Sequence, residues 1–144
     1  MSKLAVFAVL AVFGMVLVSD VTAQKKFSKV VTDSSRWDQI DHGSPEQCSG
    51  TPEDCAVKML DALNISVGEE PDFSVYRLGE IEGKNVTVVF VSHLVDEDDS
   101  VIGLLYRLEL SRGDAGSSSF NLDGVGRMFQ CMRGPIGWRK TLCP

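Results

Sequence analysis

The cysteines are the feature that most limits what this 144-residue chain can fold into. There are four of them: Cys48, Cys55, Cys131 and Cys143. Ahead of them stands a pattern typical of an export signal: Lys3, the apolar run Leu4 to Val18, and the small-x-small sequence Val21 to Ala23. We therefore predict that residues 1–23 are a signal peptide cleaved after Ala23. The product would be secreted or periplasmic, where cysteines are expected to form two disulfides.

Four cysteines allow three pairings, and we favour the two local ones, Cys48 with Cys55 and Cys131 with Cys143. Each would close a short loop that contains glycine or proline. A cross pairing stays open, because Cys55 is expected on an apolar helix face from which it could reach a sheet. A zinc or redox role is disfavoured, because such sites usually use C-x-x-C pairs, which the chain lacks.

The charge of the chain, −6 at pH 7, narrows the choice of partners. An acidic surface repels phosphate backbones, so nucleic acid is not expected as a partner, nor is an anionic membrane surface. It favours a cationic partner, so we expect an unidentified protein partner, with cationic proteins as candidates. No second apolar stretch approaches the ~20 residues of a membrane span, so no span is predicted after cleavage. We expect a monomer.

The order of predicted elements gives a fold class. Residues 24–47 are polar with sparse apolar anchors, which predicts an extended lead-in that packs through Trp37. Thr51 and Pro52 are typical of a helix N-cap and first position, so a helix is expected from Pro52 to about Leu63. Its apolar stripe repeats at helical spacing and consists of Cys55, Ala56, Met59, Leu60, Ala62 and Leu63.

After Pro71 the hydrophobic period changes to two, which predicts strands. Four are expected, over about 73–78, 86–94, 101–110 and 120–131. In the third strand the face from Ile102 to Leu110 is apolar and suits the helix stripe, whereas Arg107 and Glu109 make the other face at least partly wet. Gly124 and Gly126 suggest a bulge or a close backbone approach. The expected fold is therefore α+β: one domain over 48–144, with a helix packed on an antiparallel meander of four strands, stapled by disulfides.

This layout is similar to cystatin-like and nuclear-transport-factor-like folds. The C-terminal half also carries a pattern of its own: Asp98-Asp99-Ser100-Val101, then Tyr106 to Leu110, then Gln130-Cys131-x-x-Gly134 with Trp138 and Cys143. That pattern resembles a group of small exported bacterial proteins without an assigned function, so the resemblance implies a fold and no mechanism. The Gln-x-Val-x-Gly hairpin of cystatin inhibitors is absent, which disfavours that mode of protease inhibition.

Few motifs point to chemistry. Arg112-Gly113-Asp114 lies in a predicted strand–strand loop and matches an integrin-binding tripeptide, although these are also ordinary turn residues. Asn64 and Asn85 fit the N-glycosylation acceptor pattern. Trp138 lies inside the second cysteine pair, where burial against the open end of the sheet is favoured and an exposed contact anchor is the alternative. No catalytic motif, metal site or cofactor site is predicted.

Three functions follow as hypotheses. The favoured one is a non-enzymatic binding or inhibitor module, whose candidate binding residues are Arg112, Gly113, Asp114 and Trp138. The second is a ligand-binding cone or small enzyme with a pocket near His93. Its expected lining residues are Tyr76, His93, Tyr106 and Arg107. The third is cell adhesion through Arg112-Gly113-Asp114.

Overall fold

The computed structural model describes residues 29, 31–44, 47–95, 100–112 and 117–144. The predicted signal peptide, residues 1–23, lies outside the described residues. So do Asp98 and Asp99 of the C-terminal pattern, and Gly113 and Asp114 of the tripeptide.

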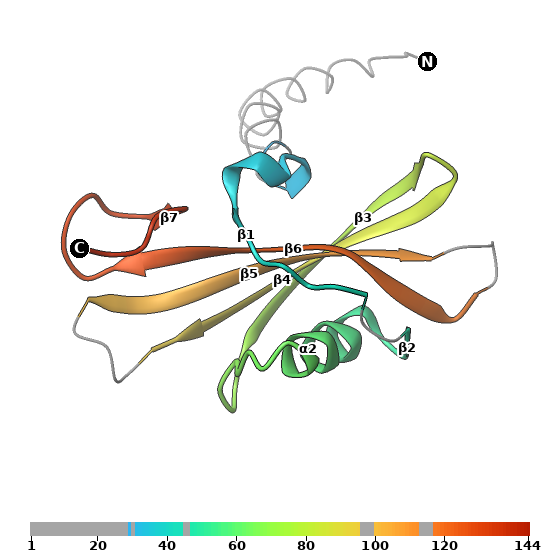
Figure 1. The fold of residues 1–144 in the computed structure, drawn as a ribbon, viewed down its shortest axis with the longest axis horizontal. Helices are drawn as coiled ribbons and strands as arrows, with labels where there is room; N and C mark the ends of the chain where they lie inside the picture. The colour runs from blue at the N-terminus through green and yellow to red at the C-terminus, as the bar shows by residue number, and fades with distance from the viewer. Residues whose placement is uncertain (1–28, 30, 45–46, 96–99, 113–116) are drawn as a thin grey trace, which may run out of the picture.

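An antiparallel sheet of seven strands dominates the structure (Figure 1). Its four long strands are β3 (Asp72–Ile81), β4 (Lys84–Leu94), β5 (Val101–Arg112) and β6 (Ser119–Cys131). Its three short strands all pair with β6: β1 (Asp38–Gln39), β2 (Cys48–Ser49) and β7 (Trp138–Arg139). The order β1-β6-β5-β4-β3 makes β6 the strand on which both ends of the described chain converge.

The predicted fold class, a helix on a four-stranded α+β meander, was wrong. Over the described residues, the structure is mostly a seven-stranded antiparallel sheet with one complete α-helix. The three additional strands have two residues each, which is too short to give a period-two signal. Periodicity therefore gives no sign of a strand at these positions.

Helix α2 (Pro52–Ala62) covers one face of the sheet. Its start follows from local chemistry, because the Thr51 side chain accepts a hydrogen bond from the Asp54 N–H at 3.1 Å. The helix buries four residues against the sheet: Cys55, Ala56, Met59 and Leu60. They join Val89, Val91, Leu108, Leu110 and Val125 of the long strands in what we call the helix-side core.

The opposite face is covered by an N-terminal arm, residues 31–40, which includes the 3-10 helix η1 (Ser34–Arg36). Figure 1 shows η1 and α2 on opposite sides of the sheet. Val31 and Trp37 of the arm pack with three sheet residues to form the arm-side core; the sheet residues are Val88, Phe90 and Met128. Trp37 is fully buried and its ring lies 5.4 Å from that of Phe90. The lead-in does pack through Trp37, as the sequence suggested.

Strand β1 is the point where the chain passes from one face to the other. Trp37, just before β1, belongs to the arm-side core, whereas Ile40, just after it, packs against the helix-side core. Between them Asp38 and Gln39 pair with Arg127 and Gly126 of β6. The chain therefore wraps around the β6 edge and contributes to both cores within four residues.

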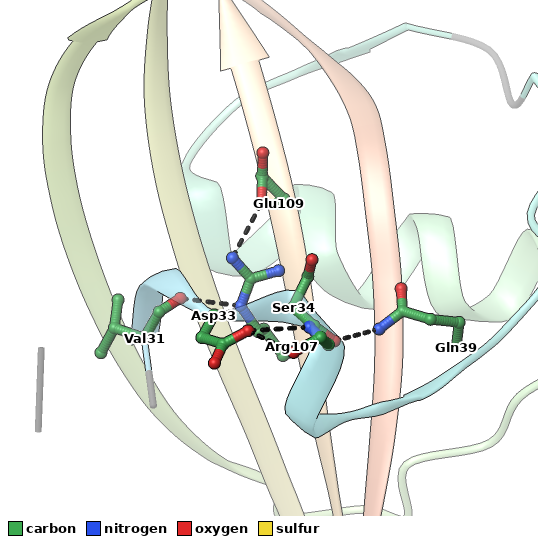
Figure 2. Close-up of polar contacts among 7 residues, drawn as sticks. Val31, Asp33, Ser34, Gln39, Arg107 and Glu109 are labelled. Carbon is green, nitrogen blue, oxygen red and sulfur yellow. Dashed lines mark hydrogen bonds and ion pairs between the residues drawn. The ribbon is translucent and has the colours of Figure 1, made fainter. Parts of the chain in front are cut away.

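Arg107 shows how the arm binds the sheet (Figure 2). Its side chain is 3% exposed; Nε donates to the Val31 carbonyl at 2.8 Å and Nη2 donates to Glu109 Oε2 at 2.8 Å. The expectation that this face of β5 is partly wet was wrong for Arg107. The arm covers the guanidinium and supplies the carbonyl that a buried charge requires.

Candidate functional site: the disulfide-closed C-terminal loop

Two disulfides hold the ends of the fold, and both join the local pairs favoured from the sequence. Cys48 is bonded to Cys55, which connects β2 to the first turn of α2. Cys131 is bonded to Cys143, which closes the segment that follows β6. Two disulfides are compatible with a secreted or periplasmic protein. The second bond defines the C-terminal loop, residues 132–142.

Several contacts fix the C-terminal loop at the end of the sheet. Its short strand β7 pairs with β6, where Trp138 lies opposite Gln130 and Arg139 opposite Phe129. The Met132 N–H donates to the Ser100 carbonyl at 2.8 Å. Lys140 Nζ donates to the Ser35 carbonyl at 3.0 Å, which ties the loop to η1. The loop is thus held at both cysteines and along one flank.

The C-terminal loop nevertheless turns its large apolar side chains outward. Four of the seven large hydrophobic residues exposed in the described chain belong to it: Met132, Ile136, Trp138 and Leu142. Ile136 is 101% exposed, as much as in an extended peptide, and lies between Gly134 and Gly137, both of which have positive φ. Exposed apolar residues gathered in one place mark contact sites more often than scattered ones do.

Trp138 was expected to be buried against the open end of the sheet, and this was wrong. Its side chain is 41% exposed. One edge of the indole rests near Gly103 of β5, where a Cβ would stand 3.3 Å from Trp138 Cη2. The rest of the ring is accessible, so Trp138 is exposed, as the alternative expectation required.

The charge of the C-terminal loop differs in sign from that of the chain. Arg133, Arg139 and Lys140 are its charged residues, and it contains no Asp or Glu, whereas the whole chain has a net charge of −6. The sequence pattern pointed to Trp138 but not to Met132, Leu142 or this local charge. The available signal was composition within the cysteine pair: large apolar and basic residues without an acid.

The other predicted site residues do not gather at this loop. Arg112 ends β5 at the far end of the sheet, where its guanidinium carbon lies 4.1 Å from the centroid of the Phe120 ring. Gly113 and Asp114 lie outside the described residues, so the tripeptide is not seen as a unit. Its arginine is engaged with the sheet.

The residues expected to line a pocket near His93 are divided between the two faces of the sheet. His93 and Tyr106 stack on the helix side, with centroids 6.1 Å apart and rings 9° from parallel. Tyr76 and Arg107 lie on the arm side, where Tyr76 packs on Phe90. The four side chains therefore do not line one pocket.

Both glycosylation candidates are exposed. Asn64 follows the last turn of α2 with a φ of 59°, and Asn85 lies near the start of β4. In the part of the chain that the structure describes, no group of three or more His, Cys, Asp or Glu side chains is placed to hold a metal ion. No helix among the same residues has the length and apolar character to cross a membrane.

Comparison of the chain with protein-family models, with curated proteins and with solved structures finds no match. Any functional assignment therefore depends on the geometry of the chain itself.

Proposed function

We propose that the protein is an exported, non-enzymatic binding module that uses its C-terminal loop to contact a protein partner. The observation that carries the proposal is the exposure of Met132, Ile136, Trp138 and Leu142 within one disulfide-closed segment. Binding energy in interfaces is concentrated in a few apolar and aromatic anchors. A projecting side chain such as Ile136 suits an apolar pocket on the partner.

The way the loop is held supports this function. Association costs free energy wherever flexible segments must become ordered. The Cys131–Cys143 bond, the pairing of β7 with β6 and the Lys140 contact to Ser35 constrain the loop before any partner arrives. Constrained loops of this kind are suited to inhibition as well as to simple binding.

The positive charge of the C-terminal loop indicates which charge the contacting surface of the partner should carry. The net charge of the chain favours a cationic partner, but the contact segment itself carries Arg133, Arg139 and Lys140 without an acid. We therefore place the contact on a partner surface with an apolar pocket and an acidic rim. A cationic partner is the competing outcome and would have to bind elsewhere on the protein.

Affinity capture with matched variants tests the proposal. Purified protein is immobilised and exposed to proteins of the fluid into which it is exported, and each captured protein is then titrated individually. Ile136→Ser and Trp138→Ala should each weaken binding by about 10- to 30-fold, the usual loss at an interface anchor. Binding should also weaken with added salt, since opposite charges attract across the rim.

Ile81→Ser is the matched control, because Ile81 is an exposed apolar residue (44%) at the β3–β4 turn and lies outside the loop. It should bind like the unmodified protein. Partners whose affinity is unchanged by both loop variants would refute the proposal. Captured proteins that are cationic and indifferent to the loop variants would favour the competing outcome.

A further inference from the structure

A pocket lies at the opposite end of the long strands from the C-terminal loop. It is a pocket of about 610 Å³ between the start of α2 and the sheet. Phe120 at the start of β6 lines it, whereas Cys131 at the end of β6 begins the C-terminal loop. The volume is within the range of about 300–1,000 Å³ that is usual for small-molecule sites.

The strand register explains which side chains reach this pocket. Arg77 of β3 pairs with Thr87 of β4, and Asn85 of β4 pairs with Arg112 of β5. Because side chains alternate along a strand, Thr87 and Asn85 point to the same face, and that face carries the helix-side core. Arg77 and Arg112 therefore approach the pocket from the two strands that flank β4. We call this site the arginine pocket.

The two arginines have no acidic partner within the described residues. Neither guanidinium forms an ion pair there, and no Asp or Glu lines the arginine pocket. This contrasts with Arg107 and Arg127, which pair with Glu109 and Asp38.

Arg112 gives an independent sign that the pocket can accept a ligand. Its Nε atom is buried and has no hydrogen-bond partner among the described residues. The guanidinium is held in place by the Phe120 ring, 4.1 Å from the centroid, so its donors are oriented before a ligand arrives. A buried donor left unsatisfied is costly, and native structures usually provide a partner for it.

We propose that the arginine pocket binds a small ligand through an oxyanionic group held between Arg77 and Arg112. Guanidinium groups present a planar fork of donors that matches phosphate, sulfate and carboxylate oxygens. Hydroxyl and amide groups of Asn85, Thr87, Ser117 and Ser118 line the same pocket and can orient the remainder of the ligand. The site is independent of the binding function proposed for the C-terminal loop.

Nuclear magnetic resonance titration tests this inference. Unglycosylated protein, which leaves Asn85 unmodified, is titrated with inorganic phosphate, sulfate or acetate at constant ionic strength, with chloride as the reference. Amide signals of Arg77, Thr87, Arg112 and Phe120 should shift with at least one oxyanion, and comparison of the three anions identifies the preferred head group. Arg77→Gln and Arg112→Gln should each weaken that affinity by about 10- to 100-fold, as expected for loss of hydrogen bonds to a charged group.

Arg36→Gln is the control, because Arg36 is an exposed arginine of η1 on the other face of the sheet. It should leave the affinity unchanged. If Arg112→Gln disturbs the fold through loss of the Phe120 contact, Arg77→Gln still decides the matter, since Arg77 is exposed at the pocket. An equal loss of affinity in Arg36→Gln would overturn the proposal. So would the absence of shifts in the pocket amide signals with any oxyanion at 10 mM, which is about the concentration at which a weak two-arginine site fills.

Discussion

The two faces of the sheet are covered by different kinds of structure. On the helix side, α2 contributes a stripe of four buried residues and is tied to β2 by the Cys48–Cys55 disulfide. On the arm side, residues 31–40 begin with the α-helical Val31 and Thr32 and continue into the 3-10 helix η1. This segment contributes Val31 and Trp37 and is tied to the sheet by the hydrogen bond from Arg107. Among the described residues, four side chains of α2 cover one face, and Val31 and Trp37 of the arm cover the other, where Arg107 of β5 is buried.

Within the described residues, the arm covers its face of the sheet with two buried side chains, whereas α2 uses four. The arm places one large aromatic residue over Phe90 and satisfies Arg107 with a main-chain carbonyl. A fully buried tryptophan removes a large apolar area from water, which compensates for the small number of arm residues. The arm side should therefore depend on few residues, and each should matter greatly.

Trp37→Ala gives the largest expected effect. Removal of a fully buried indole should lower the free energy of unfolding by about 3–5 kcal/mol. Leu60→Ala, at a fully buried position of the helix-side core, should cost a comparable ~2–5 kcal/mol. Urea denaturation of both variants makes the comparison. A cost below 1 kcal/mol for Trp37→Ala would mean that the arm side contributes little to stability.

Arg107→Ala should have the next largest effect and lower the free energy of unfolding by about 2–3 kcal/mol. The substitution leaves the Val31 carbonyl without its donor and Glu109 without its cation. Arg127→Ala is the matched control, because Arg127 also forms an ion pair, with Asp38, but is 40% exposed. It should cost no more than ~1 kcal/mol. Equal costs for the two variants would contradict a special role for the buried arginine.

The sequence predicted the helix side far better than the arm side. The Thr51-Pro52 start and the stripe around Met59 are local patterns, and the structure shows α2 over Pro52–Ala62. The arm side depends on a contact between Val31 and Arg107, 76 positions apart, which no local pattern reveals. An arginine in a strand normally indicates solvent, so the buried role of Arg107 was not predicted. The exposure of Trp138 was missed for a related reason, since burial depends on what packs against the ring.

Gly126 of β6 lies against Trp37, so a substitution there tests the arm side separately from the helix side. A Cβ on Gly126 would lie 2.6 Å from the Cβ of Trp37, too close for the arm to keep its place. Gly126→Ala should therefore cost about 1–3 kcal/mol, as overpacking does. Gly124→Ala, two residues away on β6, meets only Glu109 Cβ at 3.9 Å and should change stability by less than ~0.5 kcal/mol. Thermal unfolding of both variants distinguishes two causes. A loss of stability in Gly126→Ala alone would be due to the close approach to Trp37, whereas an equal loss in both variants would be due to the replacement of a glycine in β6.

On the helix side, the titration of the buried Tyr106 should make the stability of the protein depend on pH in the alkaline range. Burial raises the pKa of Tyr106 above 10.0, its ordinary value. The unfolded chain then loses this proton at a lower pH than the folded protein does. The stabilisation is complete below pH 10 and declines as the pH rises through the folded-state pKa. Tyr106→Phe should remove this decline, so its stability relative to the unmodified protein should improve above pH 10. An identical alkaline profile for both proteins would contradict the burial argument.

On the arm side, Asp33 titrates at acidic pH, and its effect on stability should be the smallest of those predicted. The Ser35 hydroxyl and N–H both donate to Asp33 Oδ1, at 2.6 and 3.1 Å, and the hydroxyl bond is the main cause that lowers the pKa of Asp33 below 3.8. The unfolded chain therefore takes up this proton at a higher pH than the folded arm does. The contribution is present above pH 3.8 and is lost as the pH falls through the folded-state pKa. Asp33→Asn should destabilise the arm at neutral pH and match the unmodified protein in strong acid. Hydrogen exchange at the Trp37 N–H, which bonds to the Ser34 carbonyl, reports this locally, since global unfolding would mask so small a term.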